Sequence, residues 1–442
     1  MREDEIVKAC GAKVLKSGGN AFEYCISTDT RKIKNGELYL PLKGANFDGE
    51  KFIQEALDKG AAGYFTTGDD VCASAKCVFN VKDTLEAYLQ LANFYKNKIA
   101  PIVIGITGSS GKTTTKEMVY AVVNEKFRTV KTFSNHNNEI GFCQTVFEMQ
   151  PDTEVLIVEM GMRGLGEISL ISKYAQPNFA VITNSGSAHV GRLGSLENIA
   201  KAKCEIAEFL KSEGAFIALN QDRIKNTVKY SGEKIYYSIS DVEILDKKPS
   251  FSKFVYKDKE YELNVEGDYN IENSLSAIEI GYKLGLDYEA VKRGLRSYRP
   301  IEKRWEVEEV NGLKIIHDSY NANPESMKAS VKTFLELYPN PVVVLGNMGE
   351  LGENEVELHR EVGEYFLTLD LKNVKFITIG DLASEVGKIL INLGIWVKSF
   401  EDNQSASCYI LDNLNVGNTI FLKASRSMKF EEIIECLKRG KL

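Results

Sequence analysis

The sequence contains no Cys-x-x-Cys pair, although it has eight cysteines at scattered positions. Without a ligand-like spacing, neither a structural zinc site nor a disulfide framework is expected, and most of the cysteines are predicted to be buried small hydrophobic residues. The sequence also lacks any apolar run near the roughly 18 residues that a membrane span requires, and its charged first residues argue against a signal peptide. We therefore expect a cytoplasmic protein without a membrane span.

An excess of basic residues is also missing. The formal net charge is -7 and the pI is near 5.5, which argues against nucleic acid as the main partner because binding a phosphate backbone needs a basic face. Hydrophobic residues make up 43% of the chain, which is ordinary for a globular protein with a large core. At one domain per ~150 residues, a chain of 442 residues predicts about three domains. We expect the protein to be a monomer.

One stretch changes from an apolar run to glycine and serine and then to a helical pattern. Residues 102–106 are apolar, two glycines follow, and Lys112 opens the helical segment. This order predicts a strand, a phosphate-binding loop and a helix whose N-terminal N–H groups bind phosphate oxygens. Lys112 adds a charge for the terminal phosphates, and the Thr113 hydroxyl can ligate magnesium. The usual G-x-x-x-x-G-K-[ST] pattern has glycine where this chain has Ile106, and the hypothesis is an ATP or GTP site.

The alternation of strand and helix patterns predicts an α/β protein of three domains. Residues 1–98 are predicted to form a small α/β domain, residues 99–298 a domain with a mostly parallel sheet, and residues 299–442 a doubly wound, Rossmann-like domain. Residues 230–266 are interpreted as hairpins inserted into the second domain. Ligands of such open sheets sit beyond the carboxyl ends of the strands, so the polar residues that follow each strand matter most.

Three polar features follow the predicted strands of the second domain. Glu159 ends an apolar strand and is either a magnesium ligand or a solvent-facing strand end. His189 follows the next strand and is either a second ligand or phosphate contact, or an ordinary surface histidine. The asparagine-rich segment 132–141 presents amides to a substrate or is a turn.

Two polar clusters in the first domain, residues 27–31 and 43–49, have the composition of turns. The functional alternative is a pocket for an anionic or nucleotide-like group. In that pocket Arg31 and Lys43 would supply charge and Phe47 a stacking face.

Taken in order, the motifs resemble those of the Mur ligases and folylpolyglutamate synthetases over essentially the whole chain. They are Thr107–Thr114, Asn135–Gly141, Val158–Gly161, Gly186–His189, Glu197–Lys203, Glu272–Leu275, Asp318–Pro324 and Leu345–Gly352. The last two are similar to the branch that joins D-Ala-D-Ala to UDP-N-acetylmuramoyl-tripeptide. The resemblance implies ATP-dependent amide ligation through an acyl phosphate, giving the UDP-muramoyl-pentapeptide of peptidoglycan synthesis with release of ADP and phosphate. It leaves open whether the third peptide residue is lysine or diaminopimelate.

The resemblance also implies roles for individual residues around ATP and magnesium. The nucleotide would be bound by Thr107, Gly108, Ser109, Ser110, Gly111, Lys112, Thr113, Thr114, Asn273, Arg304 and Asp318. Magnesium would be held by Thr113, Glu159, His189 and Lys203, and the catalytic residues would be Lys112, Glu159, His189 and Lys203. Lys203 stands where several family members carry a carbamylated lysine; the alternative is a solvated helix lysine.

The remaining implied roles concern the substrates. The first domain would bind the uridine diphosphate through Ser27, Thr28, Asp29, Thr30, Arg31, Lys43, Gly44, Asn46 and Phe47. Asn138 would face the peptide acceptor, while Tyr320, Asn321 and Asn323 would line the dipeptide side, with Pro324 opening the helix behind them.

Two positions depart from the family pattern. Glu50 stands where the family often has histidine, and Val190-Gly191-Arg192 follows His189 where a glutamate is usual. Another ligase of the same fold, such as a folylpolyglutamate synthetase or a tripeptide-forming Mur enzyme, is the alternative within the class. A nucleotide switch that forms no amide is the alternative from another class.

Overall fold

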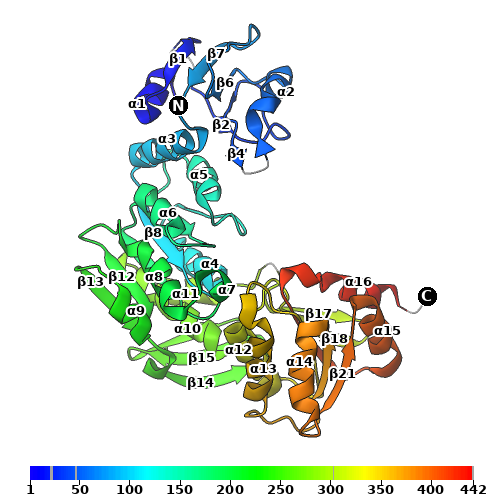
Figure 1. The fold of residues 1–442 in the computed structure, drawn as a ribbon. Coiled ribbons are helices and arrows are strands. Elements are labelled where there is room, and N and C mark those ends of the chain that lie inside the picture. Colours follow the sequence, from blue (N-terminus) through cyan, green and yellow to red (C-terminus); the bar gives the residue numbers. More distant parts are fainter. Residues whose placement is uncertain (20–22, 45–46, 302, 441–442) are drawn as a thin grey trace.

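A computed structural model describes residues 1–19, 23–44, 47–301 and 303–440 of the chain. Figure 1 shows three lobes in succession, each built on one mainly parallel sheet: an N-terminal lobe in blue, a central lobe in cyan and green, and a C-terminal lobe in orange and red. The α/β prediction with three sheet-based parts is confirmed. Of the residues assigned a role from the sequence, Asn46 lies outside the described residues.

The N-terminal lobe has a five-stranded sheet of order β1-β7-β6-β3-β2. Only β1 runs antiparallel to its neighbour. Its strands are β1 (Lys13–Lys16), β2 (Ile26–Ser27), β3 (Leu38–Tyr39), β6 (Gly63–Thr66) and β7 (Cys77–Asn80), with the short pair β4 (Lys43–Gly44) and β5 (Phe47–Asp48) beside it. Its helices are α1 (Glu3–Cys10), η1 (Gly49–Phe52), α2 (Ile53–Asp58) and α3 (Thr84–Ile99).

The central lobe has a six-stranded parallel sheet of order β13-β12-β11-β8-β10-β9. Its strands are β8 (Ile102–Thr107), β9 (Thr129–Lys131), β10 (Val155–Glu159), β11 (Phe179–Ile182), β12 (Ala215–Leu219) and β13 (Glu233–Tyr237). The helices are α4 (Lys112–Val123), α5 (Glu139–Phe147), α6 (Glu167–Ala175), α7 (Val190–Leu193), α8 (Leu196–Cys204), η2 (Glu205–Ala207), α9 (Asp222–Thr227), η3 (Ile239–Asp241), α10 (Asp268–Lys283) and α11 (Tyr288–Ser297). Strand β8 lies between β10 and β11, and all three run in parallel. The segments that follow them therefore emerge at the same sheet edge: the phosphate loop after β8, Glu159 at the end of β10, and the segment before His189 after β11.

The hairpin interpretation of residues 230–266 is wrong for its first part. Residues 233–237 form β13, which joins the central sheet in parallel with β12, because α9 carries the chain back across the sheet between the two strands. The rest forms a separate antiparallel sheet of β14 (Val242–Lys248), β15 (Phe251–Tyr256) and β16 (Lys259–Leu263).

The C-terminal lobe has a six-stranded sheet of order β17-β18-β22-β19-β20-β21, parallel except for β17. The strands are β17 (Glu306–Val310), β18 (Leu313–His317), β19 (Pro341–Gly346), β20 (Lys375–Ile379), β21 (Trp396–Phe400) and β22 (Thr419–Lys423). The helices are α12 (Pro324–Leu337), η4 (Gly352–Asn354), α13 (Glu355–Phe366), α14 (Asp381–Ile391), α15 (Asn403–Asn413), η5 (Arg426–Met428) and α16 (Glu431–Arg439). In the part of the chain that the structure describes, no helix has the length and apolar character to cross a bilayer.

Helix α3 packs against the central lobe as well as its own sheet. One continuous hydrophobic core contains Phe65 and Phe79 of the N-terminal sheet, Leu91 of α3, and Phe142 and Val146 of α5. The Lys96 ammonium, on the same helix, donates hydrogen bonds to the carbonyl oxygens of Tyr174 (2.7 Å) and Ala175 (2.8 Å) at the end of α6. The N-terminal lobe is therefore anchored to the central lobe through apolar and polar contacts of α3.

Lys96 makes this anchor sensitive to pH. Burial lowers the pKa of Lys96 from 10.5 to about 7, and the charge of Lys211 adds to the shift. Between pH 7 and about 10.4 the unfolded chain therefore binds more protons at this position than the folded chain does, so the free energy of unfolding rises with pH by at most about 1.4 kcal/mol per unit. We expect Lys96→Met to remove this rise of the free energy of unfolding with pH. Urea unfolding of both proteins at several pH values from 7 to 10 measures the difference, and parallel pH profiles would contradict it.

Candidate nucleotide and acyl-transfer site

A cavity of about 860 Å³ lies between the central and C-terminal lobes. Of the predicted site residues, it is lined by Ser109, Ser110, Gly111, Lys112, Thr113, Thr114, Asn138, Glu159, His189, Lys203, Asn273, Arg304, Asp318, Tyr320, Asn321 and Asn323. Thr113, Glu159 and His189 thus face one common space, as the magnesium hypothesis requires. Thr107 and Gly108 lie behind the lining, where the Thr107 hydroxyl donates to the Met160 carbonyl oxygen at 2.7 Å.

The phosphate loop is shaped by close approach to its neighbours. Gly111 has φ +78°, and a Cβ there would meet Asn273 Oδ1 at 2.5 Å, so this position needs glycine both for its conformation and for space. The Ser110 N–H donates to Asn184 Oδ1 at 3.0 Å, and the Lys112 ammonium donates to the Gly108 carbonyl oxygen at 2.8 Å. Burial lowers the pKa of Lys112, while the charge of Glu159 opposes that shift.

Asn184 has a role that the sequence analysis did not assign. It follows β11, and its side-chain amide also donates to Ser110 Oγ at 2.9 Å, so it fixes the loop from the neighbouring strand. Its position in the polar Thr-Asn-Ser segment after an apolar strand was the available signal.

The buried end of β10 supplies an acceptor suited to magnesium. Glu159 is 2% exposed, and its Oε1 accepts a hydrogen bond from the Asn137 amide at 3.0 Å. Among the described residues no group donates a hydrogen bond to its Oε2, which lies 3.5 Å from the Lys116 ammonium. The Thr113 hydroxyl lies on the same cavity. No group of three or more His, Cys, Asp or Glu side chains converges as a metal site within the described ranges, so phosphate and water oxygens would complete the shell. A carboxylate and a hydroxyl beside a phosphate loop fit magnesium held in this way.

His189 is held by the C-terminal lobe. It has φ +68°, and its Nδ1 lies 2.8 Å from Glu350 Oε2, while Arg192 lies 3.6 Å from the other oxygen of that carboxylate. The neighbouring His189 is the main cause that lowers the pKa of Glu350. Arg192, where the sequence departs from the family pattern, therefore takes part in an ion pair between lobes.

Two further contacts hold the same loop of the central lobe against the C-terminal lobe. The Ser187 N–H and hydroxyl donate to the two oxygens of Glu325 at 2.8 and 2.9 Å. A Cβ on Gly191 would lie 2.3 Å from the Gly352 nitrogen, so a larger residue at 191 would separate the lobes as they stand here.

Lys203 is buried on α8, with 1% of its surface exposed. Desolvation lowers the pKa of Lys203 well below its usual value, and the charge of Lys112 adds to that effect. The solvated-lysine alternative is therefore wrong. The lowered pKa favours the neutral amine, which is the form that reacts with carbon dioxide, and carbamylation itself stays a prediction.

The C-terminal lobe brings Arg304 to the phosphate loop. Its guanidinium donates to Thr113 Oγ1 at 3.1 Å and lies over the Tyr320 ring at 4.0 Å. Asp318 is paired with the buried Lys423 ammonium at 2.5 Å. Lys423 also lines the cavity, and no role was predicted for it from the sequence. Asn321 is exposed to the cavity, whereas the Asn323 side chain accepts the Ser326 N–H at 2.9 Å and caps α12.

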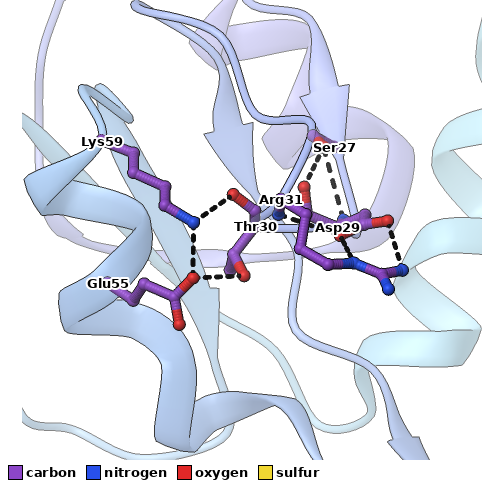
Figure 2. Close-up of polar contacts among 6 residues, drawn as sticks. All are labelled: Ser27, Asp29, Thr30, Arg31, Glu55 and Lys59. Carbon is purple, nitrogen blue, oxygen red and sulfur yellow. Dashed lines mark hydrogen bonds and ion pairs between the residues drawn. The ribbon is translucent and has the colours of Figure 1, made fainter.

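The predicted uridine diphosphate residues lie in the N-terminal lobe, and none of those described lines this cavity. Figure 2 shows that Arg31 pairs with Asp29 through two hydrogen bonds of 2.9 and 2.8 Å. This pair lowers the pKa of Asp29 to about 2. The buried Thr30 hydroxyl donates to Glu55, which also binds Lys59. Ser27 and Thr28 are half-buried beside them.

The second cluster of this lobe is organised by Glu50. Its carboxylate accepts the Thr67 N–H at 2.7 Å and lies 3.4 Å from the Lys43 ammonium. Phe47 is 55% exposed and stacks on Phe52, while Gly44 pairs with Phe47 in the β4–β5 ladder. Glu50 and Thr67 are thus the partners of the Lys43 ammonium, which donates to Thr67 Oγ1 at 3.0 Å.

Fold and cavity together define a P-loop protein whose nucleotide site is bounded by a separate C-terminal lobe. Residues 24–96, 106–281 and 303–426 match, respectively, the "Mur ligase family, catalytic domain", the "Mur ligase middle domain" and the "Mur ligase, glutamate ligase domain". The chain belongs to the Mur ligase family.

Among its relatives is the UDP-N-acetylmuramoyl-tripeptide–D-alanyl-D-alanine ligase of Bacillus subtilis, 36% identical over 93% of this chain and 92% of that protein. Among solved structures, MurF from Acinetobacter baumannii has a TM-score of 0.91 at 27% identity and covers 99% of both chains. The MurF ligase of Thermotoga maritima in complex with ADP has a TM-score of 0.82 at 26% identity, covering 94% of this chain and 97% of that one.

Proposed function

We propose that this chain is the ATP-dependent ligase that joins D-Ala-D-Ala to UDP-N-acetylmuramoyl-tripeptide, forming the pentapeptide precursor of peptidoglycan. The observation that carries the proposal is the convergence of Lys112, Glu159 and Asn321, from two lobes, on one cavity. The full-length likeness to ligases named for this reaction supports the choice of substrates.

The reaction has two steps. A carboxylate oxygen of the tripeptide attacks the γ-phosphorus of ATP, the bond from that phosphorus to ADP breaks, and an acyl phosphate forms. The amine of D-Ala-D-Ala then attacks the acyl carbon, phosphate leaves, and loss of a proton from nitrogen gives the amide. Phosphorylation is needed because a free carboxylate is a poor acceptor for an amine.

The first step brings two anions together, so the site must neutralise charge. Lys112 and the N–H groups at the start of α4 would bind the phosphates, and Arg304 would add charge from the opposite lobe. When bound, magnesium would neutralise further phosphate charge. Thr113 and Glu159 would hold the ion, and His189 and Lys203 line the same cavity. Asn273 and Asp318 would contact the nucleotide, and Asn138 the peptide.

The roles of the three lobes follow the same division. Residues 1–98 would bind the uridine diphosphate end through Ser27–Arg31, Lys43, Gly44 and Phe47; residues 99–298 would bind ATP; and residues 299–442 would bind D-Ala-D-Ala and shield the acyl phosphate from water. A cytoplasmic, monomeric enzyme stays the prediction from the sequence.

The decisive experiment follows phosphate release and product mass. Purified protein should release phosphate from ATP only with UDP-muramoyl-tripeptide and D-Ala-D-Ala together, and the product should gain the mass of the dipeptide less water. Equal turnover with glutamate and a folate would instead identify the folate-type ligase. Hydrolysis without an amide product would identify a nucleotide switch.

Asn321→Ala tests the assignment of the dipeptide side. We expect the KM for D-Ala-D-Ala to rise about tenfold, the cost of one or two lost hydrogen bonds, with the KM for ATP little changed. Steady-state kinetics with each substrate varied in turn measures the split. Asn413→Ala, on the outer helix α15, is the matched control, and an equal rise in both KM values would contradict the assignment.

A further inference from the structure

A second lysine on α4 is completely buried and has no part in the mechanism described above. Lys116 lies one helical turn after Lys112, on the same face of the helix, and has 0% of its surface exposed. Its ammonium donates to the Ser134 carbonyl oxygen at 3.2 Å and lies 3.4 Å from Glu117 Oε1 and 3.5 Å from Glu159 Oε2. A buried ammonium is tolerated only with such partners.

These contacts belong to a row of alternating charges. Lys131 pairs with the other oxygen of Glu117, so two lysines and two glutamates lie in sequence and their charges sum to zero. Glu159 is the end of the row that faces the cavity. The Asn137 amide donates a hydrogen bond to its Oε1. In the described part of the chain, Lys116 is the cation that pairs with its Oε2.

The row matters because Lys112 and Glu159 line the same cavity. With Lys116 removed, Glu159 Oε2 would be a buried carboxylate oxygen without its paired cation, and the Lys112 ammonium lines the same cavity as a charge that could replace it. Pairing between these two would take positive charge from the phosphates and a carboxylate oxygen from the metal at the same time.

We propose that Lys116 is a positioning residue that holds Glu159 in place and keeps it from pairing with Lys112. The inference rests on the nucleotide site of the proposed function, and it adds a residue that acts through Glu159 without touching substrate.

Binding of ADP with EDTA present, measured by isothermal titration calorimetry, tests this without any metal. We expect Lys116→Met to weaken ADP binding about tenfold in the wild-type background and by less than about twofold in a Glu159→Gln background, because the competing carboxylate is then gone. Lys126→Met, just beyond the end of the same helix and exposed, is the matched control and should bind like wild type.

A crystal structure of Lys116→Met supplies the second measurement, with the Lys112 ammonium expected within 4 Å of Glu159. If Lys116→Met does not fold, Lys116→Gln replaces it in both measurements. The same loss in both backgrounds, or affinity equal to wild type, would overturn the inference. Failure of the wild-type protein to bind ADP would instead count against the proposed function.

Discussion

Lys112→Ala is expected to lower the rate of amide formation by at least about a thousandfold, which corresponds to roughly 4 kcal/mol of transition-state stabilisation. The side chain is the only lysine of the phosphate loop, and it lies at the start of α4 where the terminal phosphates would be bound. The fold should survive, because its ammonium makes its hydrogen bond within the loop, to the Gly108 carbonyl oxygen. Coupled measurement of ADP release and product mass follows the loss.

The control for this variant is Lys201→Ala. Lys201 is an exposed lysine of α8 in the same lobe, and its replacement should leave turnover within about twofold of wild type. Circular dichroism and the thermal midpoint confirm folding of both variants. Near-normal turnover of Lys112→Ala would remove the basis for phosphoryl transfer at this loop.

Glu159→Gln should reduce turnover by about a hundredfold to a thousandfold and raise the magnesium concentration needed for half-maximal rate. The substitution keeps the shape of a side chain that is 2% exposed but removes the charge that attracts magnesium. Titration of activity with magnesium at saturating substrates separates these two effects.

Glu154→Gln is the matched control for the loss of one carboxylate. Glu154 is exposed just before β10 and accepts the Arg128 N–H at 2.9 Å, outside the cavity. It should leave the magnesium requirement unchanged. A Glu159→Gln enzyme with a wild-type magnesium curve would show that Glu159 is not a ligand.

The sequence was a good guide to elements whose signals are local. The apolar runs at 102–106 and 155–158 predicted β8 and β10, because a strand buried on both faces is apolar along most of its length. The prediction was wrong for residues 233–237. A short strand has the same sequence pattern whether it pairs with the following strand in a hairpin or, as here, with an earlier strand across a helix.

Predicting the site depended on motif order, and its limits have a physical cause. A strand-end rule places Glu159 and His189 at one edge of the central sheet, but it says nothing about partners from another lobe. The pairs Arg304–Thr113, His189–Glu350 and Ser187–Glu325 join residues more than 130 positions apart. For the same reason the roles of Glu350 and Lys423 were missed.

By itself, the sequence determined the three α/β units, the phosphate loop and the carboxylate beside it, because glycine placement and apolar runs act over a few neighbouring residues. Only the tertiary structure decided how the C-terminal lobe meets that loop, which charges Lys116 and Lys203 encounter, and that Asn323 is used as a helix cap. These depend on burial and on distances between segments remote in the chain, which no local pattern encodes.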